Sequence, residues 1–158
     1  MAEGASGPDK AATIELLKAV MGLWTGRRQR RAAEEAGKIR FWEDGMLQQL
    51  RLIAEGKEKK TTFRELNAKL SKSEDDVFAA LHTMKTIRNK LGGGPVARAI
   101  DNVLNNRAYG KRTIRENIRY LLDEELTKAE IKIRAGEICN QIEALNAGLD
   151  RLQRLVDG

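Results

Sequence analysis

The feature that most constrains the fold of this chain is a regular apolar repeat near its end. Between Ile131 and Val156, apolar residues recur at alternating spacings of four and three. They are Ile131, Ala135, Ile138, Ile142, Leu145, Leu149, Leu152 and Val156. This spacing places them along one side of an α-helix and is typical of a coiled-coil seam. At ~1.5 Å per residue that helix is roughly 39 Å long, and it must bury its seam against other apolar surface.

Two arrangements would bury this seam. The helix either pairs with another copy of the chain or folds back on residues 46–106 as an ordinary bundle helix. We favour self-association, so a homo-oligomer is expected. Its interface would consist of Ile131, Ile138, Ile142, Leu145, Leu149 and Leu152. An apolar stripe of slightly different phase extends upstream to Ile114, so we expect one long helix from about Arg112 to the end.

The composition of the chain favours helices over strands. Of 158 residues, 41% are hydrophobic but only 4% are aromatic, whereas a sandwich or barrel would need more β-branched, aromatic and turn residues. No apolar run is long enough to span a membrane, and no signal peptide is visible. The single cysteine, Cys139, excludes an internal disulfide and points to a reducing compartment. We therefore expect a cytoplasmic, all-α protein with a small helical core and a long C-terminal helix of coiled-coil character.

Periodicity and breaks divide the chain into four segments. Residues 1–12 lack periodicity and are expected to be a disordered lead-in. Residues 13–45 combine an amphipathic helix with an arginine-rich stretch and end in a turn at Asp44-Gly45. Residues 46–92 are expected to form a three-helix unit. Residues 93–158 hold a helix that begins at Pro95, where a first-turn proline is favourable, followed by the long oligomerising helix.

The strongest local motif is the stretch 62–81. Its sequence is Thr62-Phe-Arg-Glu-Leu-Asn-Ala-Lys-Leu-Ser-Lys-Ser-Glu-Asp-Asp-Val-Phe-Ala-Ala-Leu81. It resembles the helix-turn-helix family, in which apolar residues at the positions of Leu66, Leu70, Val77 and Leu81 pack two short helices around a turn. The resemblance implies a winged-helix-like or three-helix domain, a turn at residues 71–73, and a second helix that enters the major groove of DNA.

The motif departs from that family around its turn. Asn67 and Ser71 stand where a small residue and a glycine are usual, and no strand-like wing follows. The second helix would also open with three carboxylates, which the phosphates of DNA would repel. These are Glu74, Asp75 and Asp76. The acidic group therefore favours a protein partner at this position, while the fold implied by the resemblance still holds.

Positive charge is concentrated in the middle of the chain. Lysine and arginine total 29 against 23 acidic residues, a net charge of +6. Such a body attracts polyanions, with nucleic acid first and an anionic membrane surface second. We expect DNA or RNA to contact the basic residues of three segments. They are Arg27, Arg28, Arg30, Arg31, Lys59, Lys60, Lys111, Arg112, Arg115 and Arg119.

The arginine cluster at residues 27–31 has three interpretations. Arginine binds phosphate through two parallel hydrogen bonds, which favours nucleic acid. The cluster also follows an apolar helix face, as in helices that lie at a membrane surface. That face consists of Ile14, Leu17, Met21 and Trp24. In the third interpretation the cluster is a solvated turn and Trp24 belongs to the core.

Residues that would support catalysis are scarce. The chain has one histidine, His82, and one cysteine, and the acidic residues near Glu124 lack local histidine or cysteine partners for a metal. No phosphate-binding loop is present. We expect no enzyme activity, metal, cofactor or small-molecule substrate.

The favoured function is that of a non-enzymatic, oligomeric nucleic-acid-binding protein, regulatory or architectural. The alternative is a helical adaptor or assembly subunit that binds another protein, for example within a ribonucleoprotein complex, and peripheral membrane association comes third.

Overall fold

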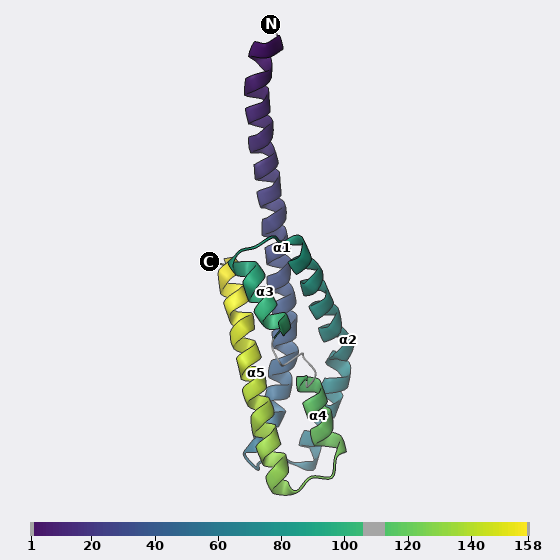
Figure 1. The fold of residues 1–158 in the computed structure, drawn as a ribbon. Helices are drawn as coiled ribbons and strands as arrows, with labels where there is room; N and C mark the ends of the chain where they lie inside the picture. Colours follow the sequence, from purple (N-terminus) through teal and green to yellow (C-terminus); the bar gives the residue numbers. More distant parts are fainter. Residues whose placement is uncertain (1, 106–112, 158) are drawn as a thin grey trace.

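Five α-helices make up the computed structural model, which describes residues 2–105 and 113–157 and the side chains from Lys10 onward (Figure 1). The helices are α1 (Ala2–Ala54), α2 (Lys60–Lys90), α3 (Pro95–Asn105), α4 (Ile114–Asp123) and α5 (Lys128–Asp157). No strand occurs in these described ranges. The all-α prediction is therefore confirmed.

The helices form an antiparallel four-helix bundle in which one position is shared by two short helices. The second half of α1 packs against α2 on one side and against α5 on the other. α3 and α4 each contact α2 and α5, and they follow one another along the remaining side of the bundle (Figure 1). The first half of α1 continues well beyond the end of the bundle (Figure 1).

The apolar seam of α5 lies inside this bundle. Five of the six residues predicted as an oligomer interface are buried in the core of the single chain, and Ile131 is half-buried against it. The five are Ile138, Ile142, Leu145, Leu149 and Leu152. The structure thus shows the fold-back arrangement rather than an exposed interface, because α1 supplies a stripe that covers the seam. A homo-oligomer stays a prediction, and it would need another surface.

The stripe of α1 is confined to the half that lies in the bundle. Its buried apolar residues are Ala32, Ala36, Ile39, Met46, Leu47, Leu50 and Ile53. They recur mostly at spacings of three and four, as a core-facing helix requires. The turn expected at Asp44-Gly45 does not form, because both residues lie within α1. Residues 2–12, expected to be a disordered lead-in, also belong to this helix.

The helix-turn-helix prediction is wrong, because residues 60–90 form one continuous helix. Ser73 caps no new helix. It is buried, and its hydroxyl donates to the carbonyl oxygen of Leu70 at 3.2 Å. The buried positions keep their spacing across this serine: Thr62, Leu66, Leu70, Ser73, Val77, Ala80, Met84 and Ile87. Burial of that unbroken stripe outweighs the weak helix propensity of the two serines.

The long helix expected from about Arg112 is divided in two. α4 ends at Asp123, and α5 begins four residues beyond its capping residue Glu124. Each new helix starts with the spacing Thr-x-x-Glu, a capping-box signature. Thr113 accepts a hydrogen bond from the backbone N–H of Glu116 at 3.0 Å, and Thr127 accepts one from that of Glu130 at 3.2 Å. The glycine break before Pro95, by contrast, lies where the sequence predicts it, since α3 begins at Pro95.

A core truncation in α5 tests whether its seam is buried within one chain. We expect Leu149→Ala to lower the free energy of unfolding by about 2–5 kcal/mol, because it removes a fully buried side chain and leaves a cavity. Leu155→Ala on the same helix is the control, since Leu155 is 38% exposed and its loss should cost about 1 kcal/mol or less. Urea unfolding at several protein concentrations measures both. A midpoint that rises with protein concentration would place the seam between chains instead.

Candidate docking arm and charged clusters

Residues 10–26 of α1, the arm, extend beyond the bundle (Figure 1). They carry a dense group of exposed apolar side chains. These side chains are 53–65% exposed: Ile14, Leu16, Leu17, Met21, Leu23 and Trp24. They are half of all the large hydrophobic side chains that are exposed among the described residues. Single exposed apolar residues are ordinary, but a contiguous group marks a surface that binds something.

The arm is amphipathic because its apolar residues keep helical spacing. Ile14, Leu17, Met21 and Trp24 follow one another at spacings of three, four and three. With Leu16, Val20 and Leu23 they cover about half of the helix circumference at ~3.6 residues per turn. The predicted apolar face is thus present on a helix, but Trp24 is exposed, so the interpretation that places it in the core is wrong.

Four arginines, the collar, stand where the arm meets the bundle. They are Arg27, Arg28, Arg30 and Arg31. Arg28 is half-buried and donates to the carbonyl oxygen of Lys90, the last residue of α2, at 3.4 Å. A cation is favourable at this helix end because its carbonyl groups carry partial negative charge. The other three arginines are exposed, and none takes part in an ion pair within the described ranges.

The remaining residues predicted to bind nucleic acid do not join the collar. Lys59 and Lys60 are exposed at the start of α2, at the opposite end of the bundle (Figure 1). The stretch of α1 from Arg31 to Ala54 separates the two ends by roughly 35 Å at ~1.5 Å per residue. Lys111 and Arg112 lie outside the described residues. The predicted contacts are therefore spread over the molecule.

Arg115 and Arg119 join α4 to α2. Arg115, predicted to contact nucleic acid, is buried, so its guanidinium is not exposed to a phosphate in this structure. Its guanidinium donates to the carbonyl oxygen of Leu70 at 3.0 Å and to the hydroxyl of Ser73 at 2.7 Å. Arg119 forms an exposed ion pair with Glu74 at 2.8 Å. Its charge is thereby partly neutralised.

The acidic group predicted to dock a protein partner lies in the middle of α2 rather than at a helix start. Glu74 is paired with Arg119, while Asp75 and Asp76 are exposed. Asp76 lines an open cavity of about 430 Å³ between α1 and α2, opposite Arg31 and Trp42 of α1. Charges of both signs line this cavity. The arrangement offers no concentrated acidic surface.

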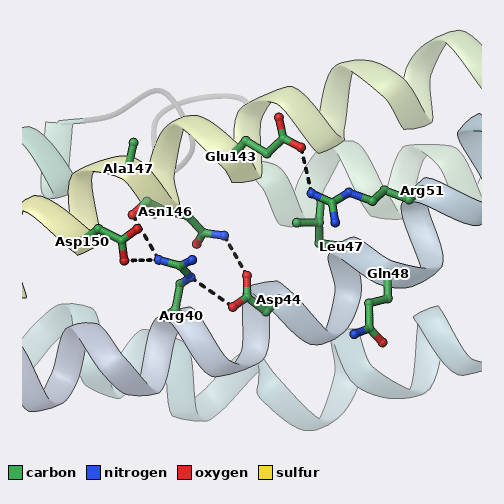
Figure 2. A pocket seen from close by; sticks show the side chains of 9 residues that line it. All are labelled: Arg40, Asp44, Leu47, Gln48, Arg51, Glu143, Asn146, Ala147 and Asp150. Atoms are coloured by element: carbon green, nitrogen blue, oxygen red, sulfur yellow. Dashed lines mark hydrogen bonds and ion pairs between the residues drawn. The ribbon is translucent and has the colours of Figure 1, made fainter.

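A second open cavity, of about 480 Å³, lies between α1 and α5 and is lined by a network of paired polar groups (Figure 2). Arg40 donates to Asp44 at 3.0 Å and pairs with Asp150 of α5. Asn146 of α5 donates to Asp44 at 2.8 Å. Burial lowers the pKa of the Arg40 guanidinium, but the hydrogen bonds and charges of Asp44 and Asp150 outweigh it and raise the pKa overall.

This network holds two helices together rather than presenting reactive groups. Its carboxylates accept hydrogen bonds from within the network, as Figure 2 shows. Further along, Arg51 of α1 pairs with Glu143 of α5 at 3.0 Å. These polar contacts fix how α1 and α5 lie against each other beside the apolar seam.

Residues suited to catalysis are not gathered anywhere in the described ranges. His82 is exposed on α2, and no group of three or more histidine, cysteine, aspartate or glutamate side chains there could hold a metal ion. Cys139 is buried on α5. Burial raises the pKa of its thiol, and the nearby charge of Arg51 only partly opposes this. A thiol in that state is a poor nucleophile.

Comparisons with protein-family models, curated proteins and solved structures give no match to the chain. The physical properties of the arm and the charged clusters are therefore the basis for a function.

We expect Arg115 to matter for stability and Arg119 to matter little. Arg115→Ala removes two hydrogen bonds of a buried guanidinium, to the Leu70 carbonyl oxygen and the Ser73 hydroxyl, and leaves a cavity between α4 and α2. These losses should lower the free energy of unfolding by about 2–4 kcal/mol. Arg119→Ala removes an exposed ion pair and should cost less than about 1 kcal/mol. Urea unfolding measures both, and equal losses would refute the assignment of Arg115 as an interior anchor.

The thiol of Cys139 should be unreactive while the chain is folded. Burial favours the neutral thiol, so we expect a thiol reagent such as dithionitrobenzoate to react far more slowly with the folded than with the urea-unfolded chain. Stability should also fall as pH rises past the ordinary thiol pKa of 9.0, because the unfolded chain ionises first. Cys139→Ala should remove that part of the pH dependence. Rapid labelling of the folded chain would contradict this account.

Proposed function

We propose that the protein is a non-enzymatic docking protein, in which the bundle is the folded body and the arm binds another surface. The observation that carries this proposal is the exposure of six large apolar side chains on a helix that leaves the bundle. Burying apolar area contributes roughly 25 cal/mol per Å². A partner that covers the arm would therefore gain most of its binding free energy there.

The arm receives little support from its own chain. A helix of about this length is marginal in water without tertiary packing. Gly22 and Gly26 weaken it further, by about 1 kcal/mol each relative to alanine, and space for a methyl group is open at both positions. The apolar stripe is thus placed where it cannot stabilise the bundle, which is consistent with a role in binding.

The bundle itself offers fewer binding groups than the arm. Its apolar seams are buried in its own core, and the network around Arg40 is internally paired. This contrast favours the adaptor alternative, in which the arm binds a partner and the bundle is attached to that partner through the arm.

Tryptophan fluorescence tests whether the arm is an open binding surface. The chain has two tryptophans, so Trp42→Phe leaves Trp24 as the only reporter. We expect strong quenching of Trp24 by iodide and an emission maximum typical of a solvated indole. An apolar dye such as anilinonaphthalene sulfonate should bind the folded protein, because the arm is its main exposed apolar surface.

A matched pair of variants identifies the surface that binds the dye. Leu17→Ser with Met21→Ser should remove most dye binding without lowering the thermal midpoint, since neither side chain belongs to the core. Phe78→Ser, which removes an exposed side chain from α2, should leave the dye signal nearly unchanged. If Trp24 is shielded in the isolated protein, or if the double variant unfolds the bundle, the proposed function is wrong.

Nucleic-acid binding is the second candidate, and the exposed arginines of the collar favour it. We expect the affinity for duplex DNA or single-stranded RNA to fall linearly with the logarithm of salt concentration. Arg27→Gln with Arg30→Gln and Arg31→Gln should reduce the slope by about 2–3, one unit for each lost phosphate contact. An unchanged slope, or no binding at low salt, would remove this candidate.

A further inference from the structure

We infer that the surface to which the arm docks is an anionic lipid bilayer, on which the arm lies flat with its apolar side among the acyl chains near the headgroups. This inference rests on the proposed docking role and names the chemistry of the partner. Two features of α1 support it: the shape of the arm and its charge.

The shape of the arm suits the surface of a bilayer. The arm is roughly 26 Å long and has an apolar half opposite a polar half. A helix of this kind lies in the membrane interface, with its apolar side buried by about 5–10 Å. Within the described residues, no helix is both long and apolar enough to cross the bilayer. Trp24 stands at the end of the apolar stripe beside the collar, and tryptophan prefers the headgroup level.

The charge of the arm and collar complements anionic headgroups. Between Lys10 and Arg31 the chain has six basic residues and one acidic residue, Glu15, which gives a net charge of +5. The exposed arginines Arg27, Arg30 and Arg31 make no ion pair inside the described ranges that would neutralise them. Each basic residue near an anionic membrane strengthens binding by about fivefold.

Beyond the collar, α1 presents one more exposed aromatic side chain, Phe41, on the side that it shares with the edge of the apolar stripe at Leu23. Phe41 follows Leu23 by five helical turns at ~3.6 residues per turn, so the two lie on the same side of α1. Phe41 is 71% exposed and contacts Trp42 edge to face, with ring centroids 5.4 Å apart. α1 is one unbroken helix through both positions (Figure 1). The exposed charged residues Arg30 and Glu34 lie between Leu23 and Phe41 on that side, so Phe41 would add a separate aromatic contact rather than continue an apolar row.

A second copy of the arm is a poorer occupant. Arg28 and Arg31 continue the spacing of the stripe after Trp24, so a pair of parallel arms would bring arginines against arginines. In an antiparallel pair the same arginines would face apolar residues. Nucleic acid would satisfy the collar but leave the apolar half of the arm in water.

Vesicle binding by the full chain tests this inference. The probe is a vesicle of equal parts phosphatidylcholine and phosphatidylglycerol, compared with one of phosphatidylcholine alone. With Trp24 as the only tryptophan, we expect cosedimentation and a blue shift of its emission with the anionic vesicles. Binding to the neutral vesicles should be weaker by more than about tenfold.

Charge and apolar variants separate the contributions to binding. Arg30→Gln with Arg31→Gln should weaken binding to anionic vesicles by about tenfold or more, because two charges leave the surface. Lys59→Gln with Lys60→Gln is the matched control: it removes the same charge at the opposite end of the bundle and should change binding little. Leu17→Ser with Met21→Ser should abolish the blue shift while the fold, measured by circular dichroism, persists.

The outcomes distinguish this inference from the proposed function. Equal binding to neutral and anionic vesicles, or equal losses in both charge pairs, would overturn the inference. Absence of vesicle binding with self-association that the Leu17/Met21 variant abolishes would also overturn it in favour of a second copy, and the docking function would stand. Binding to DNA alone would assign the collar to nucleic acid and likewise overturn the inference. If Trp24 is shielded in the isolated protein, both the membrane inference and the proposed docking function are wrong.

Discussion

The contact between α1 and α5 is the interaction on which the rest of the bundle depends. The apolar seam of α5 is covered chiefly by the second half of α1, and the network of Arg40, Asp44, Asn146 and Asp150 lies beside it. Once these two long helices are antiparallel, α2 covers another side of α1. α3 and α4 then close the remaining side against α2 and α5. The core therefore lies between the four positions of the bundle, around the seam of α5.

The sequence predicts the helices well where their periodicity is long and regular. The α5 seam and the helix start at Pro95 are both readable from spacing alone. The sequence does not predict whether the seam packs within one chain or between chains, because any apolar stripe of matching length can cover it. The decisive partner is α1, whose buried stripe through Ala32, Ile39 and Leu50 is of similar length to the seam.

The helix-turn-helix prediction at α2 is wrong because a contact with α4 stabilises the serines of α2 within one helix. The two serines at residues 71 and 73 resemble a turn, yet Ser73 is a small buried residue that accepts a hydrogen bond from Arg115 of α4. The contact between Ser73 and Arg115 cannot be predicted from local patterns, because the two residues lie far apart in the sequence. The capping signatures at Thr113 and Thr127 are local, by contrast, and would have located the division of the last helix. In the candidate site, spacing predicted the apolar face of the arm, but only the structure shows that no helix of the bundle covers it.

The arm is the part of α1 whose apolar residues do not contribute to the core of the bundle. α1 carries apolar residues along most of its length, but only the second half meets α2 and α5. We propose that residues 10–26, which are uncovered in the isolated protein, become covered on the partner surface. Hydrogen–deuterium exchange of the full chain measures this along α1. The account predicts fast exchange in the arm and slow exchange around Ile39 and Leu50, with the arm becoming protected on anionic vesicles. An arm protected as strongly as the bundle in the isolated protein would contradict it.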